Sequence, residues 1–310
     1  MKDRLWAIIL AGGEGTRLAE TTRRMYGSSL PKQFLGFGQS RTFLQATIDR
    51  MGALIPAERM VVVVPARYEE LAREQVRGFD GIEVVSQPSN RGTLPGVLLP
   101  LVHVLKRDCR ANVALVPSDH DFRTPDVMLD AIERARGSAS SSRAGMVLLG
   151  AKADAPASDL GWIVTKELRR YAAVRPIERF IEKPAPLLAD QLFRAGALWN
   201  TMLSVSRGDA LWRLAQRHSA TSTALFERYA SALGTVHASA VLHEVYQQLR
   251  ASDFSRDLVT ASRGLLATAM HDAGWSDCGT PERLEAVFGV NVVPNVAPAL
   301  SRGIAAEMTG

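Results

Sequence analysis

Residues 7–18, AIILAGGEGTRL, carry the strongest information about fold and function in this chain. The apolar run Trp6–Leu10 fits a buried strand of a parallel sheet. It leads into a glycine-rich turn, where backbone N–H groups can approach a phosphate closely because glycine has no Cβ. The planar cation of Arg17 also matches phosphate geometry. The stretch therefore predicts a phosphate site, and a tight strand-to-helix turn without a ligand is the alternative.

Two common phosphate loops do not match this turn. A Walker loop has Lys followed by Ser or Thr after its last glycine, whereas Gly15 is followed by Thr16 and Arg17. The dinucleotide fingerprint fails because Leu18 stands where its third glycine belongs. The turn is therefore of another kind.

Apolar strands and helical segments alternate through the first half of the chain. Helical patterns such as Tyr68–Val76 and Leu94–Leu105 separate the strands, which predicts right-handed crossovers. We therefore expect an α/β fold with a Rossmann-like, mostly parallel sheet flanked by helices. Ligands on such sheets lie beyond the carboxyl ends of the strands, where we expect both the glycine-rich turn and Ser118–His120. The predicted strands are Trp6–Leu10, Met60–Val64, Ile82–Val85 and Val113–Val116.

The second half reads as mixed α+β. The serine-rich stretch Gly137–Ser142 predicts a flexible surface loop, and Asn291–Gly310 predicts a loop or frayed helix. The predicted strands here are Met146–Leu149, Gly161–Thr165, Arg179–Lys183 and Leu198–Val205, and the predicted helices are Ala210–His218, Ser222–Leu233 and Val241–Arg250.

Composition narrows the class of protein. With 310 residues and 46% hydrophobic content, the chain can bury a large core. Its formal charge is +5, but the basic residues are scattered, which favours small anionic substrates over nucleic acid. Cys109 and Cys278 lack the spacing of a disulfide framework or a zinc site. Without a signal or membrane-spanning stretch, we expect a cytoplasmic protein with no membrane partner, and we leave a homodimer open.

Two polar segments follow the glycine-rich turn. In LPKQF (30–34), Pro31 fixes φ and Lys32 offers a point charge, with a merely solvated lysine as the alternative. In QPSNRGT (87–93), a polar turn between a strand and a helix suits contacts to a base or ribose. An ordinary N-capping turn explains that segment nearly as well.

Two segments each present a carboxylate in a turn. VPSDH (116–120) places Asp119 at the exit of an apolar strand, where a buried carboxylate needs a cation such as magnesium. A turn or helix cap is the alternative. We expect His120 to form hydrogen bonds rather than bind the metal, because magnesium prefers oxygen donors. GWSDCGT (274–280) carries Asp277 in a glycine-bounded turn of a kind that is usually structural.

Two further segments carry polar groups suited to a sugar phosphate. FIEKP (180–184) ends an alternating strand with Glu182 and Lys183, although any exposed strand end could look the same. Trp199 and Asn200 place an amide beside an aromatic wall, as sugar hydroxyls require.

Taken in order, LAGGEGTRL, PKQF, VPSDH, FIEKP, WN and WSDCGT resemble the sugar-1-phosphate nucleotidyltransferase family, most closely its mannose-1-phosphate guanylyltransferase branch. The resemblance spans roughly residues 6–288. It implies the nucleotide-diphospho-sugar transferase fold and the joining of a nucleoside triphosphate to a sugar-1-phosphate with Mg²⁺, GTP and mannose-1-phosphate being favoured. It also implies one domain over 1–290, with a nucleotide-binding part at about 1–150, a sugar-binding part at about 151–290 and a tail at 291–310.

The resemblance also assigns roles to individual residues. It places Lys32 on the triphosphate, Lys183 on the sugar phosphate, and magnesium on Asp119 and Asp277. The nucleotide set is Leu10, Ala11, Gly12, Gly13, Gly15, Thr16, Arg17, Gln87, Arg91 and Thr93; the sugar-phosphate set is Gly161, Glu182, Lys183 and Asn200; the catalytic set is Arg17, Lys32, Asp119, Lys183 and Asp277.

Two departures and two rival functions accompany the resemblance. Gln87 stands where the branch commonly has glutamate, and SDLGWIV (158–164) stands where a TGYGYI-like segment is usual. A cytidylyltransferase of a polyol phosphate also has PKQ after a glycine turn, but FIEKP and WSDCGT argue against it. The other rival is a non-catalytic regulator that binds nucleotide sugars. The complete set of charged residues argues against that function.

Overall fold

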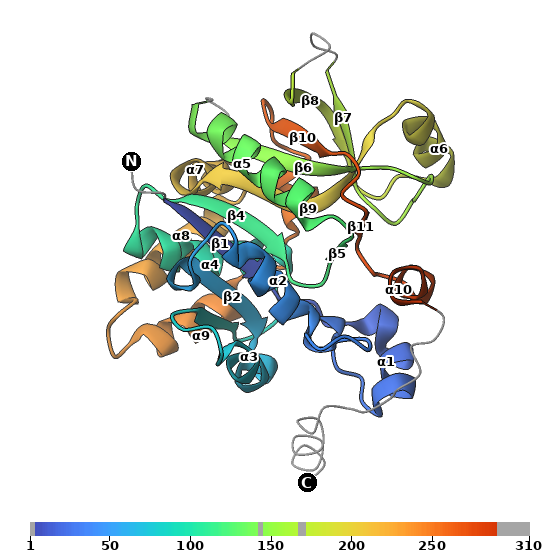
Figure 1. Cartoon of the computed structure of the whole chain (residues 1–310). Coiled ribbons are helices and arrows are strands. Elements are labelled where there is room, and N and C mark those ends of the chain that lie inside the picture. The colour runs from blue at the N-terminus through green and yellow to red at the C-terminus, as the bar shows by residue number, and fades with distance from the viewer. Residues whose placement is uncertain (1–3, 142–144, 167–171, 290–310) are drawn as a thin grey trace.

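The computed structural model describes residues 4–141, 145–166 and 172–289 (Figure 1). The tail predicted at 291–310 lies outside the described residues. None of the helices within the described ranges combines the length and apolar content that a membrane crossing requires.

A nine-stranded sheet runs through the molecule in the order β3-β2-β1-β4-β9-β6-β10-β8-β7, and β5 and β11 form a separate pair. The bounds are β1 Leu5–Leu10, β2 Met60–Pro65, β3 Glu83–Gln87, β4 Asn112–Pro117, β5 Asp121–Phe122, β6 Met146–Lys152, β7 Trp162–Thr165, β8 Val174–Ile181, β9 Leu198–Arg207, β10 Leu266–Met270 and β11 Trp275–Ser276. The section β3-β2-β1-β4 is parallel, as the alternating first half predicts.

Beyond β4 the sheet becomes mixed, which corrects the prediction of a mostly parallel sheet. Strand β9 is antiparallel to both β4 and β6. Strand β7 is antiparallel to β8 and β9, β8 is antiparallel to β10, and only β10 and β6 restore a parallel pair. The connections from β6 to β7 and from β7 to β8 contain no helix among their described residues, so they do not provide the helical crossovers that join parallel neighbours.

Helices cover both faces of the sheet (Figure 1). Trp6 and Ile8 of β1 pack into one core with α4, α7, α8 and α9, and Ala7 and Ile9 pack into the opposite core with α2, α3 and α5. The run Trp6–Leu10 is therefore apolar throughout because its strand is buried on both faces. The helix bounds are α1 Ala19–Tyr26, α2 Phe43–Gly52, α3 Glu69–Val76, α4 Thr93–Arg107, α5 Pro125–Ser141, α6 Pro186–Arg194, α7 Gly208–His218, α8 Ala220–Ala232, α9 Ala238–Gln248 and α10 Pro281–Phe288.

The flexible loop predicted at Gly137–Ser142 is wrong over residues 137–141, which continue α5. Ala131, Ala135 and Ala139 are all fully buried, so the apolar face of α5 extends past Gly137. This packing outweighs the weak helix propensity of glycine and serine. Ser142 lies outside the described residues.

The strand predicted at Arg179–Lys183 is shifted in the structure. Strand β8 starts at Val174 and ends at Ile181, so Glu182 and Lys183 follow the strand instead of belonging to it. Lys183 has a φ of 48°, a left-handed conformation that breaks the extended backbone. The two polar side chains therefore lie in the turn beyond the strand end.

The functional segments gather at the carboxyl edge of the parallel strands. Strand β1 leads into the glycine-rich turn, β3 ends at Gln87, and β4 leads into Ser118–His120. Gly15 has a φ of 69°, and a Cβ there would lie 2.8 Å from the Pro31 Cα. This position therefore requires glycine for both its conformation and its close approach to LPKQF.

Candidate active site

The glycine-rich turn is held in shape by Gln33, which is buried next to it. Gln33 Nε2 donates hydrogen bonds to the carbonyl oxygens of Ala11, at 3.0 Å, and Gly13, at 2.8 Å. Thr16 and Arg17 at the end of the turn are exposed. LPKQF thus fixes the backbone of the turn, while Thr16 and Arg17 remain exposed to solvent.

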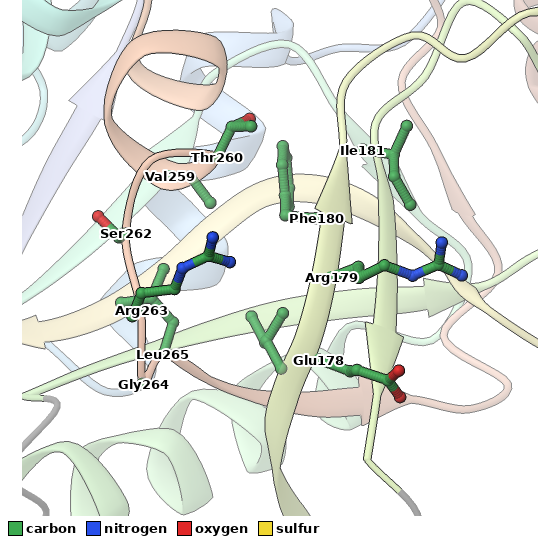
Figure 2. Close-up of a pocket in the computed structure, with 11 residues that line it drawn as sticks. Glu178, Arg179, Phe180, Ile181, Val259, Thr260, Ser262, Arg263, Gly264 and Leu265 are labelled. Atoms are coloured by element: carbon green, nitrogen blue, oxygen red, sulfur yellow. The ribbon is translucent and has the colours of Figure 1, made fainter.

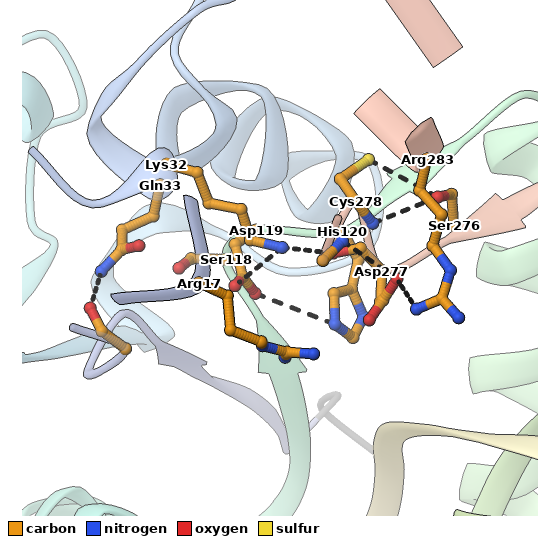
Figure 3. Close-up of polar contacts among 12 residues, drawn as sticks. Arg17, Lys32, Gln33, Ser118, Asp119, His120, Ser276, Asp277, Cys278 and Arg283 are labelled. Carbon is orange, nitrogen blue, oxygen red and sulfur yellow. Dashed lines mark hydrogen bonds and ion pairs between the residues drawn. The ribbon is translucent and has the colours of Figure 1, made fainter. Parts of the chain in front are cut away.

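Lys32 joins the segments that carry Asp119 and Asp277. Lys32 is 8% exposed, and its Nζ lies 3.3 Å from Asp119 Oδ2 and donates to the backbone carbonyl of Asp277 (Figure 3). The structure therefore brings together three residues predicted from distant parts of the sequence. We call Lys32, Asp119, His120, Asp277 and Arg283 the Asp277 cluster.

Arg283 is the member of this cluster that the sequence reasoning missed. Its Nη1 lies 3.0 Å from Asp277 Oδ1, which also accepts a hydrogen bond from the Gly279 N–H at 3.1 Å. Burial works to raise the pKa of the Asp277 carboxyl, but His120, Arg283 and Lys32 hold that pKa below its ordinary value. Asp277 therefore stays ionised despite being 8% exposed.

Asp119 and His120 complete the cluster. Burial opposes ionisation of Asp119, but the adjacent Lys32 ammonium lowers the pKa of its carboxyl below the ordinary value. Trp275 Nε1 donates to His120 Nδ1 at 3.2 Å, which leaves His120 Nε2 facing Asp119 Oδ1 at 3.8 Å. Burial lowers the pKa of His120. His120 therefore accepts a hydrogen bond from Trp275 and lies beside the Asp119 carboxylate.

Two residues of the predicted base-binding turn lie against the glycine-rich turn, Gln87 and Asn90, and Asn90 Nδ2 donates to Glu14 Oε1 at 3.4 Å. Gln87 is 6% exposed, and its Nε2 would lie 3.2 Å from a Cβ placed on Gly12. The Arg91 side chain instead donates to the Tyr246 carbonyl at 2.9 Å. Thr93 Oγ1 is hydrogen-bonded to Asp253 and to the Phe254 N–H. Arg91 and Thr93 therefore tie other segments together, and their contact with a nucleotide stays a prediction.

A second group, which we call the Glu182 cluster, consists of Gly161, Glu182, Lys183 and Asn200. The Asn200 N–H donates to the Gly161 carbonyl at 2.7 Å. A Cβ on Gly161 would lie 2.6 Å from Glu182 Oε2 and 3.2 Å from the Asn200 Cβ, so a larger residue here would displace the Glu182 side chain. Burial raises the pKa of the Glu182 carboxyl, although Lys183, whose Nζ is 4.0 Å away, works in the opposite direction.

Asp159 links the two clusters. It forms a two-pronged ion pair with Arg283, with N–O distances of 2.8 and 2.9 Å, and it lies two residues before Gly161. Arg17 Nη1 lies 3.8 Å from the same carboxylate. The glycine-rich turn, the Asp277 cluster and the segment leading into the Glu182 cluster therefore meet at one aspartate. Its position in SDLGWIV was the available sequence signal.

A cavity of about 270 Å³ lies between residues 177–181 of β8 and the segment 259–265, and its lining residue Phe180 would lie 3.3 Å from a Cβ placed on Gly161 (Figure 2). Phe180 projects into the space between the strand and the segment, and Arg179 points away from the segment (Figure 2). None of the site residues predicted from sequence lines this cavity. The candidate active site is therefore the carboxyl edge of the sheet.

Comparison with known proteins identifies the class. The family model described as nucleotidyl transferase matches residues 6–289, nearly the whole described chain. The chain belongs to the nucleotidyl transferase family.

Two curated relatives have the same activity in their names. The chain is 25% identical over 290 residues to "Mannose-1-phosphate guanylyltransferase ManC" of Salmonella typhimurium, which covers 90% of the chain and 58% of that relative. It is 24% identical over 289 residues to "Mannose-1-phosphate guanylyltransferase" of Escherichia coli K12, covering 90% and 59%. The chain thus spans little more than half the length of these curated relatives.

A solved structure has the same fold. The crystal structure of a protein from Thermus thermophilus, described as "mannose-1-phosphate geranyltransferase", has a TM-score of 0.80 and 26% sequence identity. The match covers 93% of this chain and 80% of that one. The expected nucleotidyltransferase-type α/β architecture is confirmed at this level, with the mixed sheet described above.

Proposed function

We propose that this chain is a sugar-1-phosphate nucleotidyltransferase that uses GTP and mannose-1-phosphate and forms GDP-mannose and pyrophosphate. The observation that carries the proposal is the meeting of Lys32, Asp119 and Asp277 beside the glycine-rich turn. The names of the relatives support the choice of substrates. Within one domain, we assign the nucleotide mainly to residues 1–150 and the sugar phosphate mainly to 151–290.

The reaction needs no nucleophile from the protein. A phosphate monoester has its second pKa near 6, so an oxygen of the sugar phosphate is largely deprotonated at neutral pH. That oxygen forms a bond to the α-phosphorus while the bond to the β-phosphate oxygen breaks, and pyrophosphate leaves with the electron pair. Catalysis therefore depends on in-line positioning and on neutralising charge.

Charged side chains divide this task between the two phosphate groups. Arg17 is 64% exposed and has a long contact of 3.8 Å to Asp159, so it can turn to the departing pyrophosphate, and Lys32 faces the triphosphate from inside the cluster. Lys183, also 64% exposed, holds the attacking sugar phosphate. Arginine and lysine suit these roles because both carry fixed positive charge at neutral pH.

The remaining residues of the Glu182 cluster bind the sugar. Glu182 and Asn200 provide hydrogen-bonding groups for hydroxyls, and the Gly161 backbone lies between them. The Glu182 carboxyl is half-buried, so a hydroxyl that donates to it replaces water and compensates its desolvation.

The donor set near Lys32 fits magnesium. The carboxylates of Asp119 and Asp277 are oxygen donors on two adjacent segments, and Lys32 Nζ contacts the Asp119 carboxylate and the backbone carbonyl of Asp277. Within the described ranges, no group of three or more His, Cys, Asp or Glu side chains is arranged around a common metal position. The remaining ligands would be phosphate oxygens and water, as is usual for Mg²⁺. When bound there, Mg²⁺ would neutralise phosphate charge.

A substrate panel tests the proposal. The full chain is incubated with Mg²⁺, crossing GTP, ATP, CTP and UTP with mannose-, glucose-, galactose- and fucose-1-phosphate, while pyrophosphate release is followed. We expect the highest kcat/KM for GTP with mannose-1-phosphate. Nucleotide binding without pyrophosphate release would instead support a regulator. Activity confined to CTP and a polyol phosphate, added as a separate arm, would support a cytidylyltransferase.

A further inference from the structure

The side-chain oxygen of Gln87 is hydrogen-bonded, whereas its side-chain nitrogen is free. The Tyr246 hydroxyl donates to Gln87 Oε1 at 3.2 Å. Gln87 Nε2 has no hydrogen-bond partner among the described residues and faces Gly12 in the glycine-rich turn. Gln87 is only 6% exposed. The free N–H group beside the glycine-rich turn is therefore available to donate to a ligand.

Tyr246 fixes which half of the amide is free. Tyr246 is 1% exposed, its ring packs edge-on against Phe226, and its carbonyl is held by Arg91. Burial raises the pKa of the Tyr246 phenol, so the hydroxyl keeps its proton and acts as a donor. If the amide turned over, Nε2 would face this donor, and no other acceptor for the phenol hydrogen is present among the described residues.

We propose that Tyr246 is a positioning residue that makes Gln87 present an N–H donor to the nucleobase, so that the site selects bases with an oxo group at the facing position. This inference rests on the proposed function, which places a nucleotide along the glycine-rich turn. The 6-oxo group of guanine can accept a hydrogen bond from Nε2. The 6-amino group of adenine is itself a donor, so it would face the Nε2 donor without forming a hydrogen bond. Nε2 is the Gln87 atom that lies beside Gly12, while Oε1 lies against the Tyr246 hydroxyl, so we expect Gln87 not to read the 2-amino group of guanine.

The inference predicts a particular order of purine substrates. Inosine triphosphate has the 6-oxo group of GTP but lacks the 2-amino group, so we expect its kcat/KM to lie within about 3-fold of that for GTP. ATP should be at least ~100-fold poorer, because a buried hydrogen-bonding site strongly rejects an analogue that leaves its polar groups unpaired. Each ratio is measured with the sugar-1-phosphate that gives the highest rate.

The variant Tyr246→Phe tests the positioning role. Without the hydroxyl, the amide can turn and present Oε1 to adenine, so the GTP-to-ATP ratio of kcat/KM should fall at least ~10-fold while kcat with GTP changes less than about 3-fold. Tyr229→Phe is the matched control. Tyr229 is 4% exposed, and its hydroxyl contacts His103 instead of Gln87, so this variant should keep the wild-type ratio.

Gln87→Leu supplies an independent measurement if Tyr246→Phe fails to fold. It removes the donor, so its GTP-to-ATP ratio should fall at least as far, and adding Tyr246→Phe to it should change the ratio no further. A wild-type ratio in either single variant, or an additional loss in the double variant, would overturn the inference.

Nucleotide binding separates this inference from the proposed function. If no substrate pair releases pyrophosphate, the proposed function fails, and the same ratios are measured as GTP and ATP dissociation constants by calorimetry. Tighter GTP binding that depends on Tyr246 would still support the inference. Equal affinities, or no binding of either nucleotide, would contradict it.

Discussion

The Asp277 cluster and the Glu182 cluster differ in how completely the protein pairs their charges. In the first, Lys32 and Asp277 are each 8% exposed, and both carboxylates have cationic partners within 3.3 Å. In the second, Lys183 is exposed over 64% of its side chain and lies 4.0 Å from Glu182. The charges of the Asp277 cluster are paired before any ligand binds, whereas Lys183 in the Glu182 cluster remains available to pair with a ligand. This difference predicts that the first controls kcat and the second controls KM.

The largest effect should come from the preorganised cluster. Asp277→Asn keeps the shape but removes the charge that faces Lys32 and Arg283, so we expect kcat to fall about 10³-fold, the upper end for loss of one electrostatic group. Steady-state pyrophosphate release measures it, with Asp209→Asn on α7 as the control because its ion pairs lie within and beside α7. Wild-type kcat and magnesium dependence in Asp277→Asn would show that the cluster is structural.

The open cluster should respond in KM. Lys183→Met removes an exposed charge with one weak contact, so we expect KM for the sugar phosphate to rise about 10- to 100-fold, with kcat within a few-fold and Tm nearly unchanged. The exposed Lys166, beyond the far end of β7, is the matched control as Lys166→Met. A fall in kcat with unchanged KM would place Lys183 in the preorganised set and remove the contrast.

Arg283 tests whether the ion-pair link through Asp159 matters. Arg283→Met leaves Asp277 Oδ1 with the Gly279 N–H and leaves Asp159 with its longer contact to Arg17. We therefore expect about a 10-fold lower kcat and a Tm lower by about 2–4 °C, equivalent to roughly 1 kcal/mol. Asp159→Asn should reproduce part of the loss of Tm, and the double variant should lose less than the sum. Additive effects would mean that the two residues act independently.

The sequence predicted the strand ends better than the partners of the side chains found there. The strands ending near Leu10, Val85 and Val116 follow from apolar runs, which are local signals. The pairing of Arg283 with Asp159 spans 124 positions and depends on packing between α10 and the segment before β7, which no local pattern encodes.

The errors have the same origin. The helix through Gly137–Ser141 is stabilised by burial of Ala139 against the sheet, although its own residues are poor helix formers. No role follows from the sequence for Gln33, whose amide donates to two carbonyls of the glycine-rich turn. Tertiary contacts therefore determine both the helical conformation of residues 137–141 and the role of Gln33.

The smallest expected effect concerns the pH dependence of the Glu182 cluster. Burial raises the pKa of the Glu182 carboxyl in the folded state, so the folded protein favours the neutral form. The contribution of the neutral carboxyl to folding stability is fully present below the pKa of the unfolded state, near 4.3. It is lost as pH rises through the pKa of the folded state. Glu182→Gln should therefore raise Tm at pH 7 by about 1–3 °C, which corresponds to an increase of up to about 1 kcal/mol in the free energy of unfolding. Near pH 4 the substitution should leave Tm unchanged. Glu178→Gln, at an exposed position on β8, is the control and should leave Tm unchanged at both pH values. A lower Tm for Glu182→Gln at pH 7 would mean that Lys183 pairs with this carboxylate strongly, and the two clusters would then be equally preorganised.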